Sequence, residues 1–237
     1  MKILIFIITY KASYRIQQVI NEIPFKFLNK HNYKILISDD CSDDDTIKNI
    51  NYIKRKIKNV LINFNSHNLG YGGNIKKCLK YAYQNNYNYA VMIHGDNQYS
   101  PKYIKSMLRK IFITKNIAIS GSRMYDKNAA LNGGMPVYKF IGNIFLTKLF
   151  NFLYNTSFTD CHTGYWIYNL KKIKKNWIKK FDDGFLFDLD MRLKLIEKKN
   201  LIDEIPITTR YGTERSSIHI NYALKFFFKI LLKKITK

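Results

Sequence analysis

The sequence contains few acidic residues, few cysteines and no long apolar segment. Asp and Glu number 17 against 40 Lys and Arg, which gives a formal net charge of +23. A charge of this sign favours polyanionic partners such as nucleic acid, an anionic membrane or a phosphorylated molecule. Because Lys, Asn and Ile are abundant throughout the chain, most individual lysines are expected to be ordinary solvated surface residues.

The three cysteines do not form a recognisable pattern. Cys41, Cys78 and Cys161 are far apart, odd in number and without the spacing of metal ligands. This excludes a disulfide framework and agrees with a reducing compartment. Each thiol is expected to be a small buried side chain rather than a nucleophile.

The sequence has no segment of about 18 consecutive apolar residues, so we predict no transmembrane helix. The apolar segment Ile3–Ile8 is too short to span a membrane, and no small-residue cleavage site follows it, so no signal peptide is expected. At 237 residues the chain can form one α/β domain, or one domain with a short appendage.

Strand and helix patterns alternate along the first half of the chain. Their order implies parallel strands joined by right-handed crossovers. Such a sheet binds ligands beyond the carboxyl ends of its strands. Strands are predicted at Lys2–Thr9, Lys34–Ser38, Val60–Asn63, Tyr89–His94 and Ile117–Gly121, and helices at Tyr14–Ile23, at Thr46–Lys58 and from Gly70–Gly73 to about Asn85.

Five aspartates follow the second predicted strand. Asp43, Asp44 and Asp45 precede a helix, where capping and the helix dipole explain them. Asp39 and Asp40 lie at the strand end and have no such explanation. A carboxylate there can accept a hydrogen bond from a ribose hydroxyl or a base N–H, so at least one of them is a candidate ligand-binding residue.

The fourth predicted strand ends in three alternate polar residues, His94, Asp96 and Gln98. Their oxygen and nitrogen atoms suit Mg²⁺ or Mn²⁺ bridging a diphosphate. Such a cation would neutralise the charge on a departing nucleoside diphosphate. The structural alternative is a simple strand-to-turn junction shaped by Asp96 and Asn97.

Several segments together resemble family 2 glycosyltransferases, especially the dolichol-phosphate mannosyltransferase-like branch. The resemblance implies a GT-A fold, a Rossmann-like and mostly parallel α/β sheet flanked by helices, and inverting transfer of a sugar from a UDP- or GDP-hexose. The segments are Ile8–Tyr10, Ser38–Thr46, His94–Tyr99, Gly121–Arg123, Thr163–Tyr165 and Glu204–Ile207 with Arg210 and Tyr211.

The resemblance assigns roles by position in the shared motifs. The family's usual metal motif is Asp-x-Asp, and here His94 takes its first position. Lys11 and Ala12 stand where the family often has Asn-Glu, which weakens a base-recognition role for that loop. It implies that the cation (Mn²⁺ or Mg²⁺) is bound by His94, Asp96 and Gln98, and that Asp96 and Arg123 are catalytic. The donor would be bound by Thr9, Tyr10, Asp39, Asp40, Gly70, His94 and Gln98.

Two further features leave alternatives open. Gly70, in a glycine-rich loop ahead of a helix, either contacts the donor or serves a turn that needs a positive φ. Asp160, Asp188 and Asp190 are the remaining acids, and the last two open a helix. No base is assigned among them, because a lipid-phosphate acceptor is already anionic and an alcohol acceptor would need one.

The C-terminal third contains two apolar helix patterns. Val137–Tyr154 is predicted as a helix that is either buried or membrane-facing. Ile218–Ile235 carries Lys225, Lys229 and Lys233 at four-residue spacing beside a broad apolar face. A basic amphipathic helix of this kind can lie in a membrane interface. The alternative is a last helix packed on the domain or on a second copy.

We therefore predict a GT-A domain at 1–217 and a membrane-associating tail at 218–237. Arg210, Arg215 and Ser216 precede the tail, and arginines there could bind a diphosphate or acceptor phosphate through paired hydrogen bonds.

The predicted activity is transfer of a sugar to a polyprenyl phosphate by a cytoplasmic enzyme, peripheral at the inner face of the membrane. A growing surface glycan is the alternative acceptor. A non-catalytic nucleic-acid-binding protein would explain the net charge but not Asp39, Asp40 and Asp96, because carboxylates repel phosphate unless a metal intervenes. No nucleic-acid partner is expected.

Overall fold

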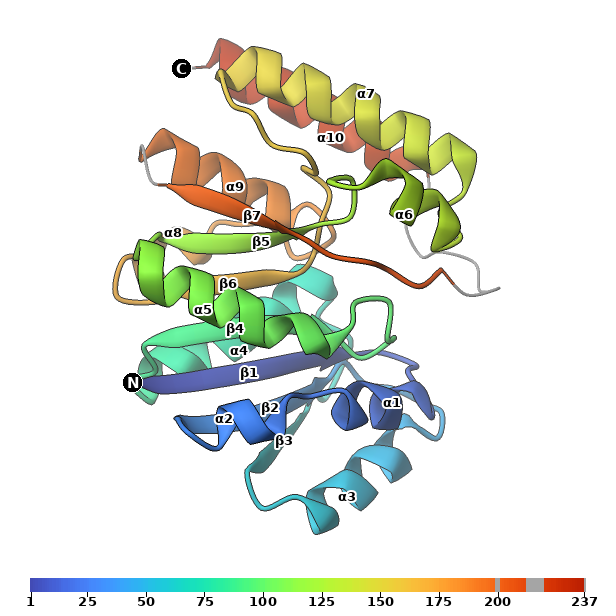
Figure 1. The fold of residues 1–237 in the computed structure, drawn as a ribbon, viewed down its shortest axis with the longest axis vertical. Coiled ribbons are helices and arrows are strands. Elements are labelled where there is room, and N and C mark those ends of the chain that lie inside the picture. The colour runs from blue at the N-terminus through green and yellow to red at the C-terminus, as the bar shows by residue number, and fades with distance from the viewer. Residues whose placement is uncertain (199–200, 212–219, 237) are drawn as a thin grey trace.

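A computed structural model describes residues 1–198, 201–211 and 220–236. Within these residues a seven-stranded sheet has the order β3-β2-β1-β4-β6-β5-β7 (Figure 1). β6 runs antiparallel to β4 and β5, and the other neighbouring strands are parallel. The strands are β1 (Lys2–Thr9), β2 (Asn32–Asp39), β3 (Val60–Phe64), β4 (Tyr89–His94), β5 (Ala118–Ser122), β6 (Trp166–Asn169) and β7 (Ile202–Pro206).

Helices cover both faces of the sheet, because alternate residues of the buried strands point to opposite sides. In β1, Ile5 joins the core on one face and Phe6 the core on the other. The first face is covered by α1 (Arg15–Asn21), α2 (Phe25–Leu28), α3 (Thr46–Lys56) and α5 (Ile104–Thr114), which follows the short 3₁₀ turn Pro101–Tyr103. The second face is covered by α4 (Tyr71–Gln84), α8 (Lys175–Ile178) and α9 (Phe187–Glu197).

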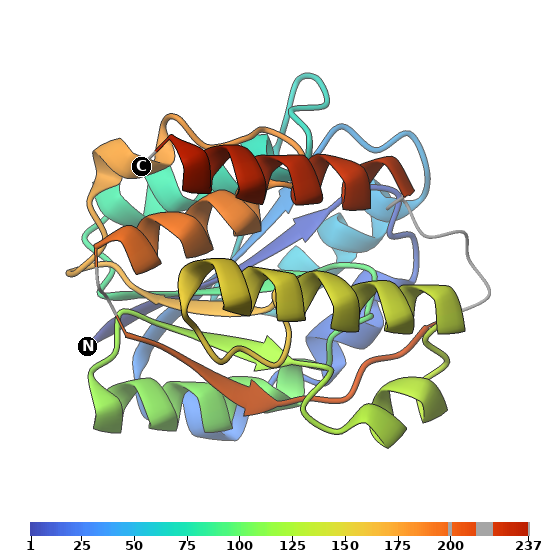
Figure 2. The ribbon, with the colours of Figure 1, turned by 90° about the horizontal axis from the view of Figure 1, so that it is seen from above.

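Two long helices lie side by side beyond the β7 end of the sheet, as Figures 1 and 2 both show. These are α7 (Val137–Tyr154) and α10 (Ile220–Ile235), and α6 (Lys127–Asn132) packs near the start of α7. Phe226 of α10 is buried against α7 and α9 in a separate apolar cluster. None of the helices in the described residues is long and apolar enough to cross a membrane.

The structure confirms the five predicted strands and adds β6 and β7. The predicted helix Tyr14–Ile23 ends at Asn21, and Pro24 precedes the separate helix α2. The Val137–Tyr154 helix has its predicted bounds. The expectation that all three cysteines are buried is wrong for Cys41, which is exposed in a turn with φ of 66°.

The register brings the carboxyl ends of the strands to one edge. Thr9 is paired with Asp39 across β1 and β2, and Ile8 with His94 across β1 and β4. β5 runs in the direction of β4, because β6 is antiparallel to both. Arg123, which follows β5, therefore leaves the sheet at the same edge.

Candidate active site

Asp39 anchors the turn that follows β2. Its Oδ1 accepts hydrogen bonds from the hydroxyls of Thr9 (2.8 Å) and Ser42 (2.7 Å), and its Oδ2 accepts one from the Ser42 backbone N–H (2.8 Å). The residue has no exposed surface. The Ser42 hydroxyl also accepts from the Lys11 backbone N–H (2.8 Å). Asp39 thus holds the loops after β1 and β2 together.

Asp40 connects this turn to the loop before α4. Its Oδ1 accepts hydrogen bonds from the Asn65 amide and from the Leu69 backbone N–H, each at 2.8 Å. Asp40 is 4% exposed, whereas Tyr10, directly after β1, is 51% exposed. Of the predicted nucleoside-site residues, Tyr10 therefore offers the most surface to a ligand in this structure.

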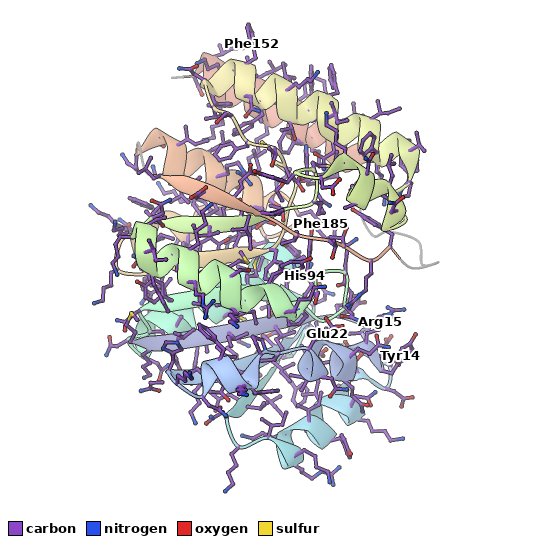
Figure 3. The ribbon with its side chains drawn as sticks, in the orientation of Figure 1. Tyr14, Arg15, Glu22, His94, Phe152 and Phe185 are labelled. Atoms are coloured by element: carbon purple, nitrogen blue, oxygen red, sulfur yellow. The ribbon has the colours of Figure 1, made fainter. Side chains whose placement is uncertain are left out.

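His94 belongs to a chain of partly buried polar groups that ends at the buried Asp188. Its Nε2 lies 3.2 Å from the Tyr71 hydroxyl, which donates to Asp188 Oδ2 at 2.7 Å. Burial lowers the pKa of His94, and the negative charge of Asp96 only partly opposes this. The imidazole is therefore neutral near pH 7 and has a lone pair for a metal ion. Phe185, labelled above His94 in Figure 3, packs on Tyr71 with ring centroids 5.3 Å apart.

The turn after β4 places Asp96 on the surface of the site. The Asp96 side chain is exposed, and its Oδ1 accepts from the Gln98 backbone N–H at 2.9 Å. Arg210 lies over the same turn: its backbone N–H donates to the Gln98 carbonyl (3.1 Å) and its Nη1 to Asn97 Oδ1 (2.9 Å). The Arg210 Nη2 also pairs with Glu22 at 2.7 Å. The structure thus brings the predicted phosphate-binding Arg210 to the predicted metal turn.

Arg123 forms a buried ion pair that the sequence did not reveal. Its Nε and Nη2 donate to the two carboxylate oxygens of Asp160 at 2.7 and 2.9 Å, and its Nη1 donates to the Tyr211 hydroxyl at 3.2 Å. Burial alone would raise the pKa of Asp160, but the charge and hydrogen bonds of Arg123 outweigh it and hold that pKa below its usual range. Arg123 is therefore fixed in one orientation at the edge of the site.

Asp188 and Arg192 form a buried layer behind His94. Burial raises the pKa of Asp188 to about 7, and its Oδ1 has no hydrogen-bond partner within the described chain. Arg192 is fully buried, with its guanidinium 4.4 Å from the Phe158 ring centroid and 4.7 Å from that of Trp166. The sequence pattern indicates Asp188 only as a possible acid or base and gives no role to Arg192.

The glycines before α4 lie against the loop that precedes α9. Gly70 has φ of 78°, and a Cβ atom there would lie 2.6 Å from the carbonyl oxygen of Asp183. This geometry favours the turn explanation for Gly70, because the glycine is required without any ligand. The last two predicted phosphate-binding residues, Arg215 and Ser216, lie outside the described residues.

The side chains after β4 can supply only part of a metal shell. In the portion of the chain with described coordinates, no three His, Cys, Asp or Glu side chains are grouped to hold a metal ion. His94 and Asp96, with Gln98, offer one nitrogen and several oxygen donors. This set fits a Mn²⁺ or Mg²⁺ ion that completes its shell with phosphate oxygens and water.

The architecture is shared with solved glycosyltransferases. Glucosyl-3-phosphoglycerate synthase from Mycobacterium tuberculosis, in complex with UDP, matches with a TM-score of 0.70 and 13% identity over 98% of this chain and 80% of that chain. S. aureus TarS (residues 1–349), in complex with UDP-GlcNAc, matches with a TM-score of 0.57 and 16% identity over 98% of this chain and 66% of that chain. These likenesses identify the fold as GT-A.

Sequence comparison gives the family. The family described as glycosyl transferase family 2 matches residues 4–177. The chain belongs to this family and is a glycosyltransferase. An uncharacterised protein of Methanocaldococcus jannaschii is 31% identical over 81% of this chain and 83% of its own length. The UDP-N-acetylglucosamine–dolichyl-phosphate N-acetylglucosaminyltransferase of Methanococcus voltae is 28% identical over 99% of this chain and 97% of its own length.

Proposed function

We propose that this enzyme transfers a sugar from a nucleotide-sugar donor to a polyprenyl-phosphate acceptor at a membrane surface. The name of the M. voltae relative, which aligns with nearly the whole chain, supports this acceptor class. The observation that carries the proposal is that His94, Asp96 and Arg210 gather at the end of β4, at the edge of the sheet where Arg123 follows β5. Carboxylates beside arginines suit a diphosphate whose charge a cation partly neutralises.

A divalent cation is part of the proposal. Glucosyl-3-phosphoglycerate synthase has been solved with Mn²⁺ and UDP together, which supports a divalent cation in this fold. Here His94, Asp96 and Gln98 would hold it, and it would supply charge neutralisation for the departing diphosphate. Arg210, which already contacts this turn, would orient the phosphates through its guanidinium.

The proposed acceptor agrees with the state of the remaining acids. Asp190 pairs with Lys229 at 2.7 Å and accepts from the Asp182 backbone N–H at 2.8 Å. Asp188 is buried behind Tyr71. Neither is presented to the open edge as a general base, and an anionic phosphate oxygen needs none. A likeness to the dolichol-phosphate mannosyltransferase branch remains a prediction.

We further propose that α7 and α10 contact the membrane at its cytoplasmic face and that residues 218–237 act as the membrane-associating tail. Each helix has an exposed apolar stripe at helical spacing, and Phe152 points outward from α7 (Figure 3). Lysines beside these stripes would meet anionic headgroups, at about 1 kcal/mol each. The stripes consist of Tyr138, Ile141, Phe145 and Phe152 on α7 and of Leu224, Phe228, Leu232 and Ile235 on α10.

The catalytic proposal is tested with the thermal stability of the protein in UDP or GDP, with and without Mn²⁺. We expect one nucleotide to raise the melting temperature only when the metal is present. Asp96→Ala should lose both this effect and sugar transfer to polyprenyl phosphate. Asp126→Ala is the matched control, because Asp126 is also an exposed aspartate whose Oδ1 accepts from the N–H two residues on, at 3.0 Å. Full transfer by Asp96→Ala would show that the metal assignment is wrong.

The membrane proposal is tested by flotation with anionic and with zwitterionic vesicles. The full chain should float with the anionic vesicles, and Phe152→Ser together with Phe228→Ser should reduce the bound fraction. Equal recovery of the wild type and the double variant would refute contact through these two helices.

A further inference from the structure

We propose that Tyr71 and Asp188 are positioning residues that hold His94 in the tautomer protonated on Nε2, so that Nδ1 presents its lone pair to the divalent cation. This inference rests on the proposed function, because it concerns the cation of the same site. It extends the site from the loop after β4 to the first turns of α4 and α9.

The Tyr71 hydroxyl has a single hydrogen to donate. That hydroxyl lies 2.7 Å from Asp188 Oδ2 and donates to it. Its oxygen can then only accept from His94 Nε2, at 3.2 Å, so Nε2 carries the hydrogen. In the neutral ring, Nδ1 then keeps its lone pair. A neutral histidine ligand binds metal through one nitrogen while the N–H of the other is fixed by a partner.

The surrounding rings leave the imidazole little freedom to turn. Tyr71 and Tyr99 both meet it edge-to-face, with ring centroids 5.4 and 5.1 Å away. Gly164 closes the remaining side: a Cβ atom there would lie 2.6 Å from His94 Cε1 and 2.7 Å from both Nε2 and the Tyr71 hydroxyl. The glycine therefore permits the contact between His94 and Tyr71, and the rings maintain it.

Because residue 94 is a histidine and not a carboxylate, it needs such partners to bind a cation. A carboxylate offers lone pairs on both oxygens, whichever way it turns. An imidazole binds a cation only through its unprotonated nitrogen, so the proton must be kept on the other one. Tyr71 provides the acceptor that does this, and Asp188 directs the Tyr71 hydrogen away from His94.

The experiment measures Mn²⁺ affinity at pH 8, from the electron paramagnetic resonance signal of free Mn²⁺ with saturating UDP or GDP. Tyr71→Phe should weaken Mn²⁺ binding about tenfold. Tyr83→Phe is the matched control, because Tyr83 lies on the same helix and loses a similar bond, to the Ile173 carbonyl at 2.9 Å. It should bind within about twofold of the wild type.

Two further measurements separate positioning from general damage. The double variant Tyr71→Phe with Asp188→Asn should bind Mn²⁺ no more weakly than Tyr71→Phe alone, because Asp188 acts through Tyr71. In the metal-free wild type at pH 8, above the pKa of Asp188, ¹⁵N NMR of the His94 ring should show the Nε2-protonated tautomer, a readout that holds even where a variant fails to fold.

The outcomes distinguish this inference from the proposed function. A wild type that binds no Mn²⁺ with either nucleotide defeats both. A wild type that binds Mn²⁺, but whose His94 is protonated on Nδ1 or whose affinity is unchanged by Tyr71→Phe, overturns the positioning role and leaves the function standing.

Discussion

Removing the Arg123 side chain should destabilise the protein strongly, because it leaves the buried Asp160 carboxylate without its ion-pair partner. Asp160 has no exposed surface, and Arg123 gives it two hydrogen bonds of 2.7 and 2.9 Å. Hydrogen bonds to a charged group contribute about 1.5–3 kcal/mol each, and breaking a buried ion pair costs about 3–5 kcal/mol. We therefore expect Arg123→Met to lower the free energy of unfolding by about 4 kcal/mol at pH 7.

The assay is urea unfolding followed by circular dichroism, with a thermal scan beside it. A loss of about 4 kcal/mol corresponds to a melting temperature lower by about 10 °C for a chain of this length. The double variant Arg123→Met with Asp160→Leu should recover part of the loss, because it removes the unpaired charge.

The pH dependence gives the sign of the effect. In the wild type the pKa of Asp160 lies below its unfolded value of 3.8, so its stabilisation is present above about pH 4 and lost as the pH falls further. In Arg123→Met, burial is opposed only by hydrogen bonds such as those from the Asn143 amide and the His162 backbone N–H, so the carboxyl takes up a proton more readily. The deficit should therefore shrink between pH 7 and pH 4. A deficit below about 1 kcal/mol, or a double variant as unstable as the sum of the single ones, would refute this reasoning.

Three other predictions concern stability alone. Burial raises the pKa of Asp188 from 3.8 to about 7, so the ionised carboxylate destabilises the folded state at high pH. In urea unfolding, Asp188→Asn should therefore be more stable than the wild type at pH 8 but not at pH 4. Gly72→Ala places a Cβ atom 2.2 Å from a backbone oxygen and should cost about 1–3 kcal/mol, whereas Gly142→Ala, with nothing within 4 Å, should not destabilise α7. Phe226→Ala removes a fully buried ring and should cost about 3–5 kcal/mol in thermal unfolding, whereas Phe228→Ala, at 58% exposure, should change it by less than about 0.5 kcal/mol.

The parallel half of the fold was predictable from local patterns. β1 and β4 are uninterrupted apolar segments, and their bounds match the predicted ones. β6 has only four residues and joins the sheet antiparallel, through pairs with β4 and β5 that are distant in sequence. β7 contains Asp203 and Glu204 and is only partly buried at the sheet edge, so its pattern does not stand out as a buried strand.

The candidate site also has a part that local patterns predict and a part that they do not. The sequence singles out Asp39 because it directly follows a predicted strand, and Asp96 because it lies two residues beyond another, where a parallel sheet collects its ligands. The partners of His94 and Arg123 were missed, because Tyr71 and Asp188 are separated by 117 residues and Arg123 and Asp160 by 37. Residues so far apart form no sequence motif with a fixed spacing, so only the folded structure identifies them as partners.

The glycines at the start of α4 also constrain how this region can vary. The Gly73 backbone N–H donates to the Asp183 carbonyl at 3.0 Å, and Cβ atoms at Gly70 and Gly72 would meet the same backbone within 2.6 Å. With so little space between them, the segment around Asp183 and the first turn of α4 must shift together. Side chains introduced at these glycines would force the two segments apart. This would also separate the hydroxyl of Tyr71 from the carboxylate of Asp188.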